Sequence, residues 1–168
     1  RIKKLYELGK QLNWNVEVDV DWTPNFTGIS DEEFDFENTQ WDKHEVFKTF
    51  DKKTRLEFFK DLNSWATSQF LHGEQGALLV ASQLASCAPT YNAKLYAASQ
   101  TFDEARHVEA FNKYLQQRLK RSWPIGRALK GLLDKILTDP RWDLKFIGMQ
   151  VVIEGLALAA FNAAKQAT

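Results

Sequence analysis

The sequence predicts an all-α fold, a bundle of long helices. Helix-breaking residues are few, with 8 Gly and 4 Pro among 168 residues, and the segments between the prolines carry apolar residues at helical spacing. A hydrophobic fraction of 44% with 26% charged residues is typical of a globular chain large enough to bury a core. The sequence shows no solenoid repeat and no low-complexity segment, so a helical bundle is the expected architecture.

Residues 1–50 are expected to form an N-terminal extension with a short helix. The stretch Val16–Trp22 alternates apolar and polar side chains and is soon followed by a proline, which predicts an extended segment. Ser30 and Glu33 have the spacing of a capping box, which would open a short helix toward Phe47.

The bundle itself is expected over residues 51–168. Asp51 and Thr90 are of the residue types that cap helices, and Pro89 between them would end the first long helix. Asp139 and Pro140 combine a cap with proline at the first helical position. The predicted helices span residues 51–88, 90–121, 125–137 and 140–168.

Charge and cysteine content exclude several classes of protein. The 22 basic residues balance 22 acidic ones, which disfavours a nucleic-acid-binding surface. The single cysteine, Cys87, excludes an intrachain disulfide framework and a cysteine-rich zinc site, and we expect it to be a buried thiol. Nothing at the start of the chain resembles a signal peptide, and uninterrupted apolar runs such as residues 76–81 are too short to span a bilayer. We therefore expect a cytoplasmic protein that binds neither nucleic acid nor membrane.

Two acidic residues lie where the helical pattern predicts the core. The residues three and four positions from Glu74 on either side, and the one seven positions after it, are all apolar: Phe70, Leu71, Ala77, Leu78 and Ala81. Glu154 has the same kind of surroundings apart from Gln150: Ile147, Val151, Ala157, Leu158 and Phe161. Because an unpaired buried carboxylate is costly or becomes protonated, both residues need a partner.

A third acid is paired with a histidine. Glu104 and His107 are three residues apart and point to one side of their helix, on the face that continues through Ala97 and Phe111. Carboxylates are hard oxygen ligands that can bridge two cations, and imidazole adds a nitrogen donor that suits iron. A Glu-x-x-His pair directed into a bundle core is the arrangement of di-iron and di-manganese carboxylate bundles. Buried ion pairs without a metal are the alternative interpretation.

Three sequence runs resemble the ferritin-like di-iron carboxylate superfamily: Gly73-Glu74-Gln75-Gly76, Asp103-Glu104-Ala105-Arg106-His107 and Val152-Ile153-Glu154-Gly155-Leu156. The second run most resembles the hydroxylase α-subunits of bacterial multicomponent monooxygenases and related single-component di-iron oxygenases. The resemblance covers residues 54–168 and implies that Glu74, Glu104, His107 and Glu154 are metal ligands. It also implies that Asp103 orients a metal-bound histidine and that Arg106 joins the same hydrogen-bond network.

The resemblance implies an O2-activating non-haem di-iron oxygenase or oxidase that acts on a small organic substrate. Its cofactor would be two Fe ions or a mixed Mn/Fe pair, and O2 would be the co-substrate. Electrons would come from a reductase or another donor, because the sequence contains no flavin or nicotinamide motif. A homo-oligomer is compatible with this function. Two alternatives stay open: ferritin-type iron oxidation and storage, and a helical interaction module with a vestigial metal site.

The family pattern includes a second Glu-x-x-His on a fourth core helix, which this sequence does not contain. We therefore expect a bundle truncated before that helix, with one weak metal position and with Leu156 and Ala160 exposed. His44 lies in a charged run, and His72 is two residues from Glu74 and so on another face of the helix. Neither histidine replaces the missing ligand.

Other residues near the ligand positions have two interpretations each. Gln100 and Gln150 lie one turn before Glu104 and Glu154, and we expect them to bond each other rather than to line the polar edge of a pocket. Four phenylalanines would either wall a substrate cavity or pack in the core: Phe70, Phe102, Phe111 and Phe161.

Overall fold

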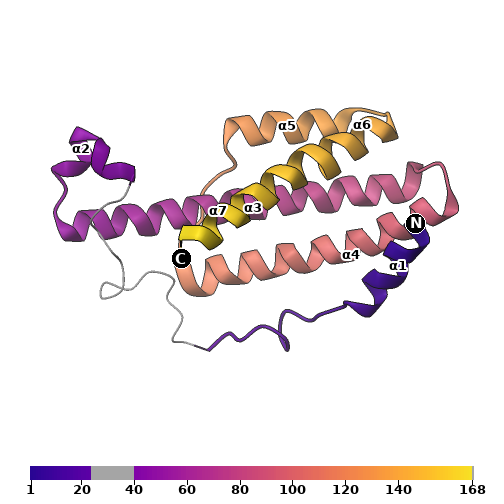
Figure 1. The fold of residues 1–168 in the computed structure, drawn as a ribbon, viewed down its shortest axis with the longest axis horizontal. Coiled ribbons are helices and arrows are strands. Elements are labelled where there is room, and N and C mark those ends of the chain that lie inside the picture. Colours follow the sequence, from indigo (N-terminus) through magenta and orange to yellow (C-terminus); the bar gives the residue numbers. More distant parts are fainter. Residues whose placement is uncertain (24–39, 168) are drawn as a thin grey trace.

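The computed structural model describes residues 1–23 and 40–167, and every regular element within those residues is helical (Figure 1). This confirms the all-α class. In chain order the elements are α1 (Ile2–Gln11), the 3₁₀ turn η1 (Gln40–Lys43), α2 (Glu45–Lys48), α3 (Lys52–Cys87), α4 (Tyr91–Tyr114), the π-helical turn η2 (Leu115–Leu119), α5 (Arg127–Thr138), α6 (Trp142–Phe146), the π-helical segment η3 (Ile147–Ile153) and α7 (Glu154–Ala167).

Two long antiparallel helices, α3 and α4, form the centre of the fold (Figure 1). The Asp51 carboxylate accepts a hydrogen bond from the Thr54 amide at 2.8 Å, and the Thr90 hydroxyl accepts one from the Ala93 amide at 3.3 Å. Both predicted N-caps are therefore confirmed. Cys87, which was expected to be buried, is exposed because it is the last residue of α3.

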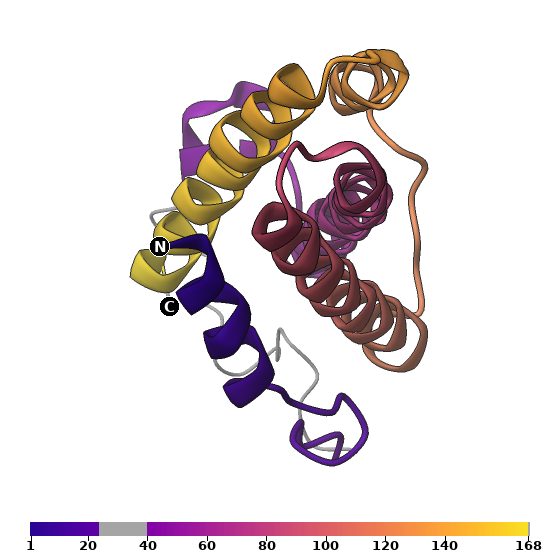
Figure 2. The ribbon, with the colours of Figure 1, turned by 90° about the vertical axis from the view of Figure 1, so that its right-hand side faces the viewer.

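The helix that carries Glu154 is continuous from α6 through η3 to α7 and lies to one side of the α3–α4 pair (Figure 2). It begins at Trp142 and not at the predicted Pro140. The reason is local: the Asp139 carboxylate accepts a hydrogen bond from the Arg141 amide at 2.9 Å, which forms a turn ahead of the helix.

The core lies where α3, α4, α5 and η3 meet. Its buried members are small and branched side chains: Ala77, Val80, Leu84, Ala97, Leu133, Ile136 and Met149. Two glycines allow close helix contacts there, since a Cβ atom at Gly76 would lie 2.6 Å from Leu133 Cδ2 and one at Gly148 would lie 2.7 Å from Ile136 Cγ1. This packing fixes α5 against α3 and the start of the last helix against α5.

The N-terminal residues depart from the sequence prediction. Helix α1 packs against α4, and it was not predicted. The stretch Val16–Trp22 forms a turn and irregular chain instead of a regular extended segment, because the Asp19 carboxylate accepts a hydrogen bond from the Asn15 amide at 2.7 Å. The start of the helix predicted from Ser30 lies outside the described residues, and its described end is divided into η1 and α2.

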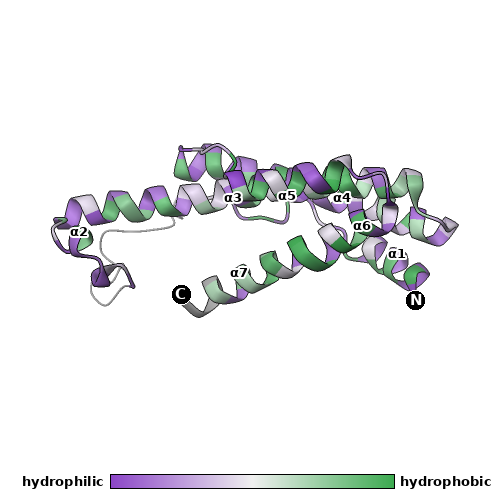
Figure 3. Ribbon diagram, turned by 90° about the horizontal axis from the view of Figure 1, so that it is seen from above, coloured by the Kyte–Doolittle hydropathy of each residue, from purple (hydrophilic) through white to green (hydrophobic). Residues whose placement is uncertain are grey.

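The last helix leaves a large apolar surface exposed (Figure 3). Leu156 is 63% exposed and Ala160 is also exposed, as expected from the sequence. The helical stretch Trp142–Ala163 is long and apolar enough to cross a membrane by length and composition alone, and little of it is buried. This stretch does not stand out in the sequence as an uninterrupted apolar run, because Lys145 and Glu154 divide it.

Candidate metal centre

Helices α3 and α4 bring three predicted ligands together. His107 Nδ1 lies 3.2 Å from Glu74 Oε2 and 3.2 Å from Glu104 Oε2. One ligand atom from each of the three residues lies within 4.8 Å of the others. We call Glu74, Glu104 and His107 the α3–α4 triad.

The triad is partly shielded from solvent. The Glu104 side chain is only 7% exposed and that of Glu74 is 15% exposed, whereas that of His107 is 40% exposed. The low exposure of the two glutamates follows from the helical pattern. Glu104 lies on the same helix face as the buried Ala97, and Glu74 lies about one helical turn before the core residue Ala77. The two carboxylates therefore lie where a charge needs a partner.

Glu154 lies near the triad but is not among the residues that contact His107 directly. Burial and the negative charges of Glu104 and Glu74 raise the pKa of Glu154 to about 7. The side chain is half-buried, and it lines the same cavity as Glu74. The fourth predicted ligand is thus within electrostatic reach of the other three.

The three residues of the triad have pKa values that are shifted in different directions. Hydrogen bonds to Glu104 and Glu74 raise the pKa of His107 to about 10. Burial raises the pKa of Glu74. Burial alone would also raise the pKa of Glu104, but hydrogen bonds with His107, Glu74 and Gln100 outweigh it and lower that pKa. The two carboxylates of the triad thus share a single imidazolium.

This donor set fits divalent metal ions of the first transition row. Carboxylate oxygens and one imidazole nitrogen are the ligands that iron and manganese accept, and His107 Nδ1 already faces both carboxylates of the triad. Cations would also neutralise the excess negative charge that raises the pKa of Glu154. Without a metal, the same atoms form an ion pair between protonated His107 and the two glutamates.

Gln100 supports Glu104 from one turn earlier in α4. Its Nε2 donates a hydrogen bond to Glu104 Oε1 at 3.1 Å. The expected bond between Gln100 and Gln150 is therefore wrong: Gln150 Nε2 is buried without a hydrogen-bond partner among the described residues. The two glutamines instead line a common cavity.

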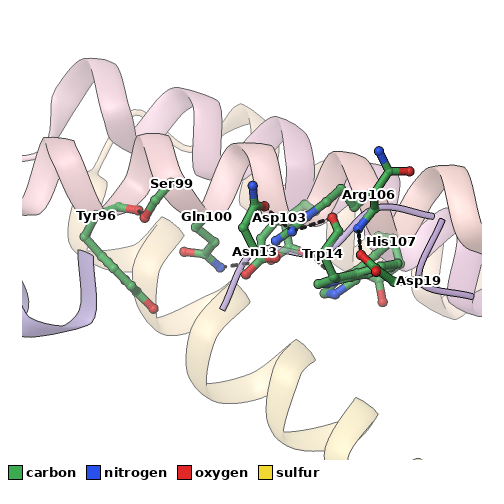
Figure 4. Close-up of polar contacts among 12 residues, drawn as sticks. Asn13, Trp14, Asp19, Tyr96, Ser99, Gln100, Asp103, Arg106 and His107 are labelled. Atoms are coloured by element: carbon green, nitrogen blue, oxygen red, sulfur yellow. Dashed lines mark hydrogen bonds and ion pairs between the residues drawn. The ribbon is translucent and has the colours of Figure 1, made fainter. Parts of the chain in front are cut away.

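Arg106 is buried and ties the N-terminal residues to the site (Figure 4). It donates hydrogen bonds to the Asn13 side chain, to the Trp14 carbonyl at 2.9 Å and to Asp103. The Trp14 ring stacks on the His107 ring with centroids 6.0 Å apart. Asp103 pairs with Arg106 and not with a histidine, and the sequence contained no signal for Trp14.

A mainly apolar cavity of about 510 Å³ lies between α3, α5 and the last helix, and Glu74 and Glu154 form part of its wall. We call it the first cavity. Phe70 lines it and stacks between Phe111 and Phe161, with centroid distances of 5.9 and 4.7 Å. Phe102, in contrast, is 57% exposed. Of the four phenylalanines, three therefore lie together beside the first cavity.

The other two histidines lie away from the triad, as the sequence predicted. His44 is exposed at the start of α2, and His72 Nε2 lies 3.0 Å from the Trp123 carbonyl.

No protein-family model, curated protein or solved structure matches the chain in the three comparisons. The interpretation of the site consequently rests on its own geometry and chemistry.

Proposed function

We propose that this chain forms the metal-binding bundle of an O2-activating non-haem di-iron carboxylate oxygenase or oxidase of the ferritin-like type. The observation that carries the proposal is the meeting of Glu74, Glu104 and His107, with Glu154 in reach, at the wall of an apolar cavity. The cofactor would be two Fe ions, or a mixed Mn/Fe pair, and when bound it supplies the one-electron and O2 chemistry that side chains lack.

Each residue has a distinct part in this proposal. Glu74 and His107 would hold one ion, Glu104 would be shared by both ions, and Glu154 would serve the second ion. The hydrogen bond from Gln100 fixes the carboxylate of Glu104, and the Trp14 ring limits rotation of the His107 imidazole. The partial burial of the carboxylates reduces competition from water.

The first cavity is the proposed substrate site. Its volume of about 510 Å³ is in the range of small-molecule pockets, and its wall is mainly apolar, with Gln69, Glu74 and Glu154 as the polar exceptions. A small, mainly apolar organic substrate fits this lining and would lie directly beside the ligand carboxylates. Electrons are expected from a separate reductase or other donor.

One observation favours a different function. Protonated His107 forms ion pairs with the two glutamates of the triad, so their charges are partly balanced without a metal. This arrangement suits a helical interaction module that binds no metal. Ferritin-type iron storage is not favoured by any feature of the described residues. Metal uptake distinguishes these functions, since a module binds no metal and a storage protein takes up far more than two ions per chain.

The test is an anaerobic titration of the purified chain with Fe(II), read by calorimetry and by elemental analysis. We expect tight binding at the triad, and we expect Glu104→Gln to weaken it by more than about 100-fold, because a bridging ligand is lost. The matched control is Glu109→Gln, an exposed glutamate on the same helix, which should bind like the unmodified chain. Equal binding by both variants, or no binding by the unmodified chain, would contradict the proposal.

A further inference from the structure

A second cavity, of about 400 Å³, lies at the end of the bundle where α3 turns into α4, and none of its lining residues belongs to the first cavity. Its wall is mainly apolar, with Ile2 and Leu5 from α1, Ala93 from α4 and Phe146 from α6. The volume lies within the range of pockets that hold small molecules. Neither the metal site nor the proposed substrate site uses this space.

Four polar side chains also line the second cavity: Thr90, Tyr96, Gln100 and Gln150. The Thr90 hydroxyl is already used in the cap of α4. Tyr96 and Gln100 project from the same side of α4 (Figure 4). The amide nitrogen of Gln100 is already used in the bond to Glu104. Gln150 Nε2, in contrast, is buried and has no hydrogen-bond partner in residues 1–23 and 40–167. A buried donor without a partner is rare, and rotation of the Gln150 amide toward the second cavity would allow a ligand oxygen to satisfy it.

The charge around these polar groups restricts the ligand. Burial and the negative charges of Glu104, Asp103 and Glu154 raise the pKa of Tyr96. Since an anion placed beside Tyr96 and Gln150 would be repelled by the same carboxylates, a carboxylate or phosphate ligand is disfavoured. A neutral oxygen acceptor has no such penalty.

We propose that the second cavity is a binding site for a neutral aliphatic molecule with one oxygen acceptor, such as a medium-chain ketone. Its oxygen accepts a hydrogen bond from Gln150 Nε2, and its hydrocarbon chain lies against Ile2, Leu5 and Phe146. None of these residues is a proposed metal ligand, so the site is independent of the proposed function and forms in metal-free protein.

Binding of 2-nonanone to the metal-free chain tests this site, with calorimetry and ligand-observed NMR as readouts. We expect saturable binding that weakens by about tenfold in Gln150→Leu, which removes the donor, and that is lost in Ala93→Phe, which fills the space. The matched control, Ala98→Phe, adds the same bulk at an exposed position of α4 that lines neither cavity, and it should leave the affinity unchanged. Ala157→Phe fills the first cavity and shows whether 2-nonanone binds there instead. Nonanoate, with a charged head group on a similar chain, should bind at least about tenfold more weakly.

Several results would overturn the proposal. These are the absence of saturable binding to the unmodified chain, equal affinity for 2-nonanone and nonanoate, or loss of binding in Ala157→Phe but not in Ala93→Phe. Because Gln150→Leu replaces an unpaired buried amide by an apolar side chain, it should fold. A thermal melt of each variant identifies any variant that does not fold. In that case the comparison of 2-nonanone with nonanoate on the unmodified chain tests the proposal without that variant.

Discussion

Glu74 and Glu104 lie on helices that pack against each other along their length, whereas Glu154 lies on a helix with a largely exposed outer face. The first two carboxylates contact His107 directly, and Gln100 and Trp14 hold the surrounding side chains. Glu154 influences the triad through charge, and no hydrogen bond to it is seen among the described residues. The comparison indicates a preorganised half and an adjustable half of the proposed metal centre.

This difference has a consequence for metal binding. Ligands held by packing and by neighbouring hydrogen bonds lose little freedom when an ion binds, so the triad should fill first. The position beside Glu154 has fewer nitrogen donors within reach and lies on the exposed helix, so it should fill at higher metal concentration. Substitutions in the two halves of the proposed centre test this difference.

The largest effect is expected at Trp14, which belongs to the preorganised half. Trp14→Ala removes the ring that stacks on His107, and we expect about 10- to 100-fold weaker metal binding at the triad. Trp14→Phe keeps an aromatic ring and should restore most of the affinity. Titration with Co(II), followed by its visible absorption, measures both the affinity and the ligand geometry. Identical spectra and affinities for the alanine variant would show that the ring does not position His107.

An effect of intermediate size is expected from a pair of glycines, one in each half. In Gly76→Ala the new methyl group would lie 2.6 Å from buried Leu133, and we expect the free energy of unfolding to fall by about 1 kcal/mol. In Gly155→Ala the methyl group meets open space, and helix propensity should raise the free energy of unfolding by about 0.5 to 1 kcal/mol. Urea denaturation measures both values. A loss of stability in Gly155→Ala would mean that α7 is more tightly packed than its exposure indicates.

The smallest effect concerns the charge of Glu154 in metal-free protein. Its pKa is raised to about 7, so the folded chain keeps this proton over a pH range where the unfolded chain has lost it. This residue therefore makes the free energy of unfolding fall as the pH rises from about 4.5 to 7. Glu154→Gln removes that fall, and the variant should gain about 1 kcal/mol over the unmodified chain between pH 5 and 8, after allowance for solvent screening. Denaturation curves of both proteins at pH 5 and pH 8 test this. If the difference in free energy of unfolding between them were the same at the two pH values, the Glu154 side chain would be solvent-exposed in the folded chain.

The sequence predicted the long helices better than the N-terminal residues, for physical reasons. Asp51, Pro89 and Thr90 act through local hydrogen bonds and steric exclusion, so their effects can be inferred without tertiary structure. Helix α1 and the turn at Asn15–Asp19 depend on packing against α4 and on side-chain hydrogen bonds, which apolar periodicity does not report.

The candidate site shows the same division. Helical spacing was sufficient to place Glu74, Glu104 and His107 on facing sides of two helices. It could not reveal that Trp14, far away in the sequence, stacks on His107, because that contact depends on the path of the N-terminal residues. Nor could it decide the partner of Gln100, since a bond to Glu104 within one helix and a bond to Gln150 between helices have the same sequence signature.

The most direct test of the metal centre is anomalous diffraction at the iron edge from crystals grown anaerobically with Fe(II). We expect a strong peak among Glu74 Oε2, Glu104 Oε2 and His107 Nδ1, and a second peak of lower occupancy toward Glu154. Both peaks should disappear in Glu104→Gln. Iron found only at other residues, with the His107 ion pair to Glu74 and Glu104 intact, would refute the proposed metal centre.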